Sequence, residues 1–542
     1  MDKKKRNILI TIVLLIGIIA IIGVSYALWS LNLTQKGQND IASSCFNITF
    51  TDKNNISLQK AYPIIDEDGK KLTPYEFTIT NTCDSYASFN VNLEVLNTTT
   101  LTNNDAVKAM ISSKTGATET EINTNLLSSY KTTTKTLNNA QTAFNLTTGY
   151  LNAKESKTYT LRLWLDENVG MNTEGVQNAK FSSKVVVTTS YVEGIPATAT
   201  IADLVSGADT SSTDVYTVPN KTSDSCTYTL AYDGTTDNNL RYVGSNPCNY
   251  VKVDNEIWRI IGVMNNIDDG TGKKETRIKL IRNESIGRYS WDTSDGGVND
   301  GLGVNEWSQA DLMKLLNPGY ESESVGGSLY YNNESGNCYK GFKNATKSCD
   351  FTTTGIKTNL KNLVGNTLWN TGTNGTNGWT SASNGLASHF YSYERSNNGK
   401  ICTSGDGFNG NPCNDTITRT TTWNGKIGLM YPSDYGYATS GGSTSKRTSC
   451  LNKELDNWGS SSYSDCKNND WLYNSSNWHW TISPSAGGHN ANLAFFVYYD
   501  GSVDTSGAGT DASVRPSVYL LSKTSILGGE GTETNPYTLS GN

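Results

Sequence analysis

The feature that most limits the fold of this chain is an alternation of apolar and polar residues with a period of two. In each run, large apolar side chains take every second position, as in Phe46-Ile48-Phe50, Tyr75-Phe77-Ile79, Phe89-Val91-Leu93-Val95 and Tyr159-Leu161-Leu163-Leu165. A β-branched run from Lys184 to Thr189 follows, and one helix is expected around Asp105 to Ile111. Strands with one apolar and one polar face form antiparallel sheets that cover a core on one side. The alternation therefore predicts an antiparallel β-sandwich that ends near Val192.

The N-terminus predicts export across a bacterial-type membrane. A basic patch, Lys3 to Arg6, precedes an uncharged run from Ile8 to Val24. Positive charge stays on the cytoplasmic side, so this order sends the rest of the chain outward. The segment is either a signal peptide cleaved after Ala27, which we favour, or an anchor from Ile8 to Trp29. The expected location is the outer face of the membrane, or the cell surface and medium after cleavage.

Composition narrows the classes of protein. A chain of 542 residues has room for two to four domains, and a net charge of −7 without a basic stripe argues against nucleic acid as a partner. The 29 Tyr and 12 Trp supply enough apolar surface to fill β-sandwich cores, so a disordered stalk is not expected.

Ten cysteines fall as five neighbouring couples, and an even count in an exported chain predicts disulfides. The couples are Cys45 and Cys83, Cys226 and Cys248, Cys338 and Cys349, Cys402 and Cys413, and Cys450 and Cys466. Sequential pairing is the simplest scheme, although the sequence does not fix connectivity. No Cys-x-x-Cys occurs and no His adjoins a cysteine, so we expect neither a zinc site nor another metal or cofactor.

The first 192 residues contain the short motifs Ser25-Tyr26-Ala27, Ser43 to Ile48, Leu72-Thr73-Pro74, Ile79 to Thr82 and Leu93 to Asn97. In this order they resemble the camelysin and TasA group of Gram-positive surface and biofilm-fibre proteins. The resemblance implies a jelly-roll sandwich exported with a dedicated signal peptidase. Cys45 and Cys83 depart from the usual cysteine-free pattern. The protease activity attributed to some members is not expected, because no His-Glu-x-x-His occurs and no histidine precedes residue 193.

We therefore divide the chain into an export segment (1–29), a β-sandwich (30–192), a linker (193–245) and a second domain (246–542). The linker is expected from its Ser, Thr, Asp and Gly content. In the second domain, Ile257 to Val263 and Arg277 to Arg282 read as a hairpin around Asp268 to Gly272. Helices are expected at Trp307 to Leu316 and Gly355 to Trp369.

The closing stretch contains, in order, Trp478 to Pro484, Phe495 to Tyr499, the turn Asp500-Gly501-Ser502 and Val514 to Leu520. This order resembles the C-terminal half of C-type-lectin-like and formylglycine-generating-enzyme-like domains of bacterial and phage surface proteins. It implies an α+β lectin-like domain, so the fold class is mainly β with some α. The Glu-Pro-Asn and Trp-Asn-Asp calcium motifs are missing, and so is the cysteine pair of the oxidase members. A solvated turn is favoured over calcium at Asp292 to Asp300.

Catalysis is not expected, because the three histidines, His389, His479 and His489, lie far apart and no Gly-x-Ser-x-Gly occurs. His479, between two tryptophans, reads as a packed strand residue. Strand alternation places Phe495, Val497 and Tyr499 on a core face and the opposite residues on a ligand face. The candidate ligand contacts are His489, Asn490, Asn492, Phe496, Tyr498 and Asp500. The alternative, that both aromatic sets are core, stays open.

The predicted function is recognition or adhesion at a bacterial cell surface, with an extracellular protein or glycan as the ligand. The alternative is a structural subunit of an extracellular fibre or biofilm matrix, with self-assembly through strand addition. An envelope hydrolase is the least favoured class, since no acid, base or metal cluster can be assembled from the sequence.

Overall fold

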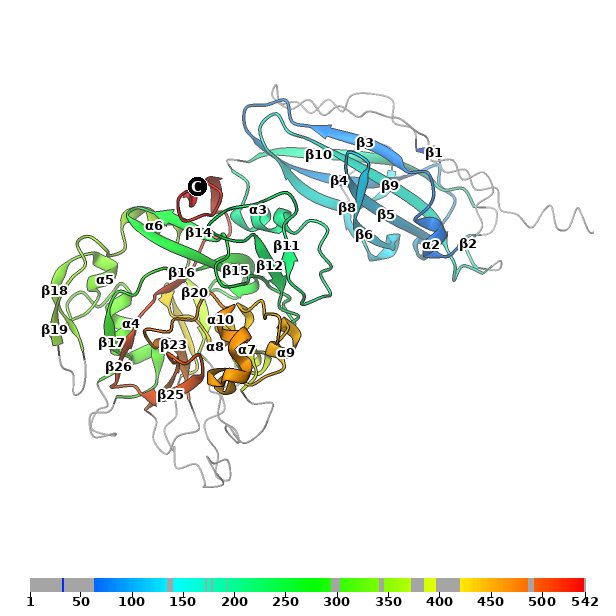
Figure 1. The fold of residues 1–542 in the computed structure, drawn as a ribbon. Helices are drawn as coiled ribbons and strands as arrows, with labels where there is room; N and C mark the ends of the chain where they lie inside the picture. Colours follow the sequence, from blue (N-terminus) through cyan, green and yellow to red (C-terminus); the bar gives the residue numbers. More distant parts are fainter. Residues whose placement is uncertain are drawn as a thin grey trace, which may run out of the picture. The chain divides into compact units, whose positions relative to one another are not determined.

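The computed structural model describes residues 32–33, 63–133, 140–170, 173–176, 179–192, 194–293, 303–340, 346–371, 385–395, 420–485 and 492–540. The chain divides into two compact units, unit 1 (Met1–Ile195) and unit 2 (Pro196–Asn542). Both are built mainly from strands, with short helices concentrated in unit 2, which confirms the mainly β class with some α (Figure 1).

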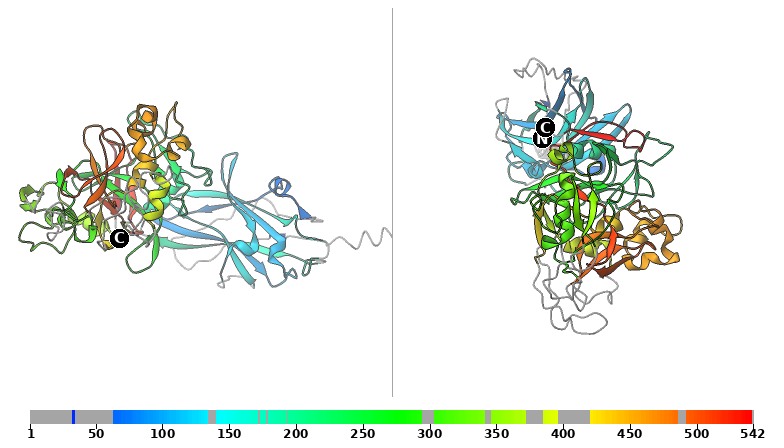
Figure 2. Two further views of the ribbon diagram at one scale, coloured as in Figure 1. Left: turned by 90° about the horizontal axis from the view of Figure 1, so that it is seen from below. Right: turned by 90° about the vertical axis from the view of Figure 1, so that its left-hand side faces the viewer.

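Unit 1 contains two sheets, whose strands can be followed in Figures 1 and 2. The first has the order β1 (Asn32–Leu33), β10 (Ser182–Val192), β4 (Tyr86–Leu96), β8 (Ala140–Leu151) and β7 (Lys131–Thr133). The second has the order β2 (Pro63–Ile64), β9 (Ser156–Asp166), β5 (Val107–Thr115) and β6 (Thr118–Leu126), with β3 (Tyr75–Thr80) also on β9. The short helices are α2 (Asp66–Gly69) and the 3-10 turns Asn104–Ala106 and Leu127–Ser129.

One hydrophobic core joins the two sheets, so unit 1 is a β-sandwich. The period-two prediction is confirmed, because the alternate apolar residues of β3, β4 and β9 are buried together, among them Phe77, Ile79, Val91, Leu93, Leu161 and Leu163. The helix expected around Asp105 to Ile111 is wrong beyond a single 3-10 turn. Val107, Ala109 and Ile111 point into the core from β5, and burial of that strand face outweighs local helix preference.

The largest sheet of unit 2 has ten strands. Its path is β11 (Tyr216–Thr217), β12 (Thr229–Tyr232), β13 (Leu240–Tyr242), β15 (Glu256–Asp268), β14 (Tyr250–Val253), β29 (Tyr537–Ser540) and β28 (Ser525–Gly528). β16 (Lys274–Arg282) pairs with β15 and with β27 (Ser517–Tyr519), which also pairs with β22 (Ile427–Gly428). The predicted hairpin of β15 and β16 is confirmed, and its turn is closed by backbone N–H groups of Gly270 and Gly272 on the carboxylate of Asp268.

A second sheet of unit 2 carries the closing stretch of the chain. Its order is β17 (Arg288–Ser290), β26 (Asp511–Ser513), β23 (His479–Pro484), β24 (Leu493–Val497) and β25 (Val503–Gly507). Two further ladders join β18 (Ser335–Tyr339) to β19 (Thr346–Asp350) and β20 (Thr367–Asn370) to β21 (Thr422–Gly425).

Short helices fill the remainder of unit 2. They are α3 (Ala197–Leu204), α4 (Asp311–Leu316), α5 (Leu329–Asn332), α6 (Thr358–Leu363), α7 (Ala387–Tyr393), α8 (Pro432–Tyr437), α9 (Arg447–Leu451), α10 (Ser464–Asn468) and the 3-10 turns Trp307–Gln309, Leu455–Gly459 and Ser461–Tyr463. The helix predicted at Trp307 to Leu316 occurs as a 3-10 turn followed by α4. Of the helix predicted at Gly355 to Trp369 only α6 forms, because Trp369 pairs with Trp423 across β20 and β21.

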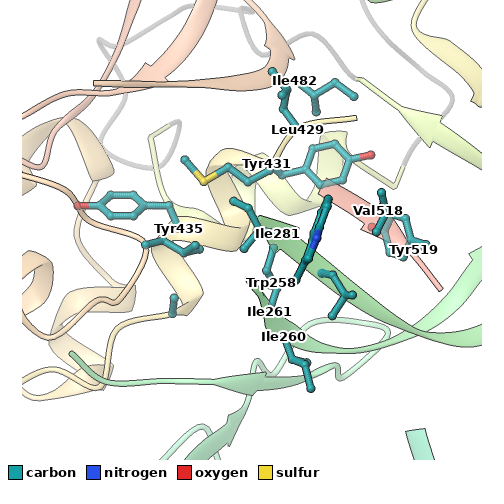
Figure 3. Packing of buried hydrophobic residues seen from close by; sticks show 14 of the residues in the cluster. Trp258, Ile260, Ile261, Ile281, Leu429, Tyr431, Tyr435, Ile482, Val518 and Tyr519 are labelled. Carbon is teal, nitrogen blue, oxygen red and sulfur yellow. The ribbon is translucent and has the colours of Figure 1, made fainter. Parts of the chain in front are cut away.

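The core of unit 2 lies where both sheets meet α8. Figure 3 shows Trp258 of β15 and Ile281 of β16 packed with Tyr431, Val518 and Tyr519, with Ile482 of the second sheet above them. The prediction that residues 193–245 form a linker is wrong, because this core includes side chains from that segment. Residues 197–242 form α3 and β11 to β13, and their apolar side chains, such as Ile201, Leu230 and Tyr242, are fully buried in the same cluster.

Three of the five expected disulfides are present among the described residues: Cys226–Cys248, Cys338–Cys349 and Cys450–Cys466. Each joins sequential cysteines, as predicted. Cys45, Cys402 and Cys413 lie outside the described residues, and Cys83 is buried in unit 1. The segment before β1, including Ala27, also lies outside them. Within the described ranges, no helix is long and apolar enough to cross a membrane.

Candidate ligand-binding surface

The closing stretch of the chain forms a graded series of aromatic rings from the core to the surface of unit 2. Ring centroids lie 6.0 Å apart between Trp480 and Phe496, 4.9 Å between Phe496 and Trp478, and 5.8 Å between Trp478 and Tyr498. The rings of Tyr498 and Tyr499 are 3.9 Å apart. Trp480 and Phe496 are buried, Trp478 and Tyr498 are half-buried, and Tyr499 is 51% exposed. The outermost rings thus rest on a rigid core.

The turn between β24 and β25 holds the two tyrosines in place. The Asp500 carboxylate accepts hydrogen bonds from the backbone N–H and hydroxyl of Ser502, and Gly501 takes the positive φ of +92° that this turn requires. Lys467 Nζ donates to the carbonyl oxygen of Asp500. A turn fixed by these bonds presents its rings with little conformational entropy left to lose on binding.

Two side chains from other segments extend this surface. The Tyr473 hydroxyl donates to the carbonyl oxygen of Tyr499 over 2.8 Å. The guanidinium of Arg288 lies 5.3 Å from the ring centroid of Trp478 and also donates to the carbonyl oxygen of Asp511. We call Arg288, Tyr473, Trp478, Tyr498 and Tyr499 the aromatic surface. It offers ring faces for stacking, together with hydroxyl and guanidinium groups for hydrogen bonding.

The surroundings of Tyr498 keep its phenol neutral. A hydrogen bond with Tyr499, followed by burial and the neighbouring Tyr499 and Asp500, raises the pKa of Tyr498. The Tyr498 hydroxyl therefore remains protonated at physiological pH and can donate as well as accept.

The structure places the residues that were expected to contact a ligand in different environments. Tyr498 and Asp500 lie at the turn, as half-buried side chains. Phe496 is buried against Trp478 and Trp480, and Asn492 is buried as well, so neither side chain belongs to the exposed part of this surface. His489 and Asn490 lie outside the described residues.

The assignment of alternate residues from Phe495 to Asp500 to a core face and a ligand face also needs correction. Phe495 and Val497 are buried as expected, but Phe496 on the opposite face is buried too. Tyr499, assigned to the core face, is exposed instead, because β24 ends at Val497 and the alternation stops there. The Asp500-Gly501 turn signal was visible in the sequence and could have shown this. Arg288 and Tyr473 were missed, since only the tertiary fold brings them to Trp478 and Tyr499.

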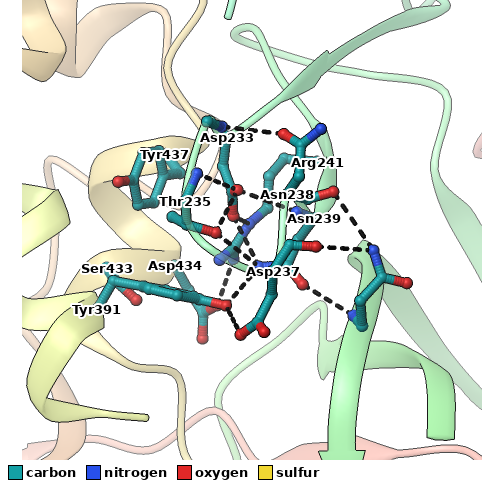
Figure 4. A network of polar contacts seen from close by, with 12 residues as sticks. Asp233, Thr235, Asp237, Asn238, Asn239, Arg241, Tyr391, Ser433, Asp434 and Tyr437 are labelled. Carbon is teal, nitrogen blue, oxygen red and sulfur yellow. Dashed lines mark hydrogen bonds and ion pairs between the residues drawn. The ribbon is translucent and has the colours of Figure 1, made fainter. Parts of the chain in front are cut away.

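A second cluster of polar groups lies inside unit 2 (Figure 4). Arg241 donates to Asp233 over 3.1 Å and to Asp434 over 2.6 Å, and all three side chains are buried. Lys279 Nζ completes the pairing of Asp434 over 2.5 Å. Two cations thus face two carboxylates without contact with solvent. These ion pairs tether β13, β16 and the segment that follows β12 to Asp434 of α8.

The two histidines in the described part of the chain, His389 and His479, lie on different elements, α7 and β23. His479 is 2% exposed in β23, where burial and the positive charges of Arg515 and Arg288 lower its pKa to about 3. It is therefore a neutral, packed strand residue. His389 lies on α7 beside Tyr393, with ring centroids 4.8 Å apart.

One group of acidic side chains in the described part of unit 1 has the spacing of metal ligands: Asp66, Asp166 and Glu167. Lys108 Nζ lies 2.7 Å from Asp66 Oδ1 and 2.9 Å from Asp166 Oδ2. An ammonium thus takes the place that a cation would occupy, and the group is an ion-pair cluster.

Fold and surface together define a mainly β protein of two units, the second carrying an aromatic surface at a fixed turn. Comparison of the chain with protein-family models, curated proteins and solved structures gave no match.

Proposed function

We propose that this chain is exported by its N-terminal segment and recognises glycans at a bacterial cell surface through the aromatic surface of unit 2. The observation that carries the proposal is the pair formed by half-buried Tyr498 and exposed Tyr499 on a fixed turn. Ring faces held in place stack on the apolar faces of sugar rings, and neutral hydroxyls beside them hydrogen-bond to sugar hydroxyls. The β-sandwich of unit 1 would act as the platform. A protein ligand is the other outcome of the same test.

The test is binding of the full-length chain, kept in detergent micelles, to immobilised gastric mucin, to mucin stripped of its glycans and to peptidoglycan sacculi. We expect binding to at least one glycan-bearing probe, and an affinity about tenfold weaker in Tyr499→Ala, because removing a stacked aromatic anchor costs about 1–3 kcal/mol.

Leu527→Ala is the matched control, since Leu527 is exposed to a similar degree on β28 and lies outside the aromatic surface. Equal binding of stripped and intact mucin would indicate that the ligand is a protein and not a glycan. Equal affinities of wild type and Tyr499→Ala for every probe would overturn the proposal.

The second candidate, a fibre subunit, is favoured by one observation in unit 1. Among the described strands, β10 pairs along its outer edge with β1 at Ser182 and Ser183 alone. The remaining edge could accept a strand from another chain. Electron microscopy of the exported protein decides this: ordered filaments would support the fibre subunit, and monomers at high concentration would exclude it.

A further inference from the structure

A small hollow lies beside the β11 edge of the large sheet in unit 2, in residues separate from the aromatic surface. Its volume is about 260 Å³, and its lining comes from the end of α3, the loop that follows it and strands β11 to β13. Val205, Ala231 and Leu240 are buried and form an apolar floor. The half-buried rings of Tyr216 and Tyr232 also line it.

The loop of residues 205–216, which lines the hollow, is held in place by several hydrogen bonds. Asn238 donates to the carbonyl oxygen of Thr210 over 2.8 Å, and the buried Arg447 donates to that of Thr213 over 2.7 Å. The Tyr216 hydroxyl donates to the carbonyl oxygen of Ser206. The hollow is therefore formed before any ligand arrives, so a ligand would not have to order the loop.

The charged residues that line the hollow are all acidic. Asp209 and Asp214 are exposed lining residues, and no lysine or arginine lines it. Ser211 donates to Asp209 Oδ1 through its backbone N–H and its hydroxyl, and these bonds lower the pKa of Asp209. The carboxylate stays ionised, with Oδ2 directed to no described protein donor. The lining thus combines two acidic residues, two tyrosines and apolar side chains, and this combination favours a cation with an apolar body.

We propose that this hollow is a second binding site of unit 2 and takes a small organic amine with an apolar or aromatic body. The protonated amine lies at Asp209 and Asp214, and the body packs on Val205, Ala231 and Leu240. An anion would be repelled by the two carboxylates. The site is independent of the aromatic surface, because the two share no lining residue.

The test is titration of the full-length chain in detergent micelles with three probes of one shape, observed by saturation-transfer NMR. The probes are phenethylamine (cation), 2-phenylethanol (neutral) and phenylacetate (anion). We expect phenethylamine to bind tightest and phenylacetate not at all. In Asp209→Asn/Asp214→Asn the affinity for phenethylamine falls about fivefold and that for 2-phenylethanol is unchanged, as expected for solvent-exposed ion pairs.

Two further variants separate the hollow from other surfaces. Asp224→Asn/Glu533→Gln removes the same net charge from exposed residues outside the lining and should leave binding unchanged. Ala208→Phe fills the hollow from a half-buried position and should abolish binding of both phenethylamine and 2-phenylethanol. Tighter binding of 2-phenylethanol than of phenethylamine, phenethylamine binding that survives Ala208→Phe, or no binding of phenethylamine would overturn the proposal.

Discussion

Lys279 Nζ lies 2.5 Å from Asp434 Oδ2, and neither side chain reaches solvent. The ammonium also lies 4.1 Å from the ring centroid of Tyr431, with the rings of Trp369 and Tyr519 at 5.3 Å and 5.2 Å. The aromatic faces and the carboxylate replace the water that Lys279 loses on burial. This pair joins the large sheet to α8, which packs against β24, the strand that precedes the aromatic surface.

Asp434→Asn should destabilise unit 2 strongly. The substitution leaves Lys279 and Arg241 facing each other without their shared carboxylate, and an uncompensated buried charge costs about 3–5 kcal/mol. Denaturant unfolding followed by tryptophan fluorescence measures this, because most of the tryptophans lie in unit 2. Asp504→Asn, at an exposed position on β25, is the control and should change the free energy of unfolding by less than about 0.5 kcal/mol. Similar values for the two variants would contradict this account of the network.

Glu394→Gln should stabilise unit 2 at alkaline pH. Burial, together with the neighbouring charge of Asp434, raises the pKa of Glu394 to about 7. The folded state therefore holds a proton that the unfolded chain releases near pH 4.5, so wild-type stability is highest below that pH and falls as pH rises to 7. The loss amounts to about 3 kcal/mol. The difference between the free energies of unfolding at pH 5 and at pH 8 should be smaller in Glu394→Gln than in wild type. An equal difference in the two proteins would contradict the raised pKa of Glu394.

The strands that alternate in sequence could be predicted, and so could the three disulfides of the described residues. Phe77, Val91 and Leu161 define the inner faces of the sandwich because each strand carries its own pattern. The linker prediction failed for the opposite reason. Strands β11 to β13 have two to four residues each within Ser- and Asp-rich sequence. Leu230 and Tyr242 pair with each other across β12 and β13 and become core residues only because β13 joins the large sheet through β15.

The candidate surface could be located only in part. Tyr498 and Asp500 were accessible to sequence reasoning because a Gly-containing turn follows a strand. Arg288 and Tyr473 come from distant segments, and no local pattern connects them with Trp478 or Tyr499. The buried ion-pair network around Asp434 could not be predicted from the sequence for the same reason, since Lys279 and Asp434 are separated by 155 residues.

Removing the Cys450–Cys466 disulfide, in Cys450→Ala/Cys466→Ala, should destabilise unit 2 by about 3 kcal/mol, the chain-entropy value for a loop of this length. The bond closes a segment with a sequence separation of 16 and joins α9 to α10, and both cysteines are buried. Thermal unfolding of the variant and the wild type under non-reducing conditions measures the loss. An unchanged midpoint would mean that the bond does not constrain the unfolded chain.

His479→Leu should make the protein more resistant to acid. In the described part of the chain neither ring nitrogen of His479 has a hydrogen-bond partner, so leucine removes no bond. Its folded pKa of about 3 lies below the value near 6.5 of the unfolded chain, so the unfolded state binds the extra proton between these values. Wild-type stability is then fully present above pH 6.5 and is reduced by about 3 kcal/mol at pH 4.

The measurement for this prediction is the free energy of unfolding at pH 7.5 and at pH 4 in wild type, His479→Leu and Val497→Ala. Val497 is the cross-strand partner of His479, and shortening it removes packing without changing a titrating group. Val497→Ala should therefore lose similar stability at both pH values, whereas His479→Leu should narrow the difference between them. If His479→Leu loses as much stability on acidification as wild type, other groups account for the acid sensitivity, and the buried imidazole is protonated or solvated in the folded state.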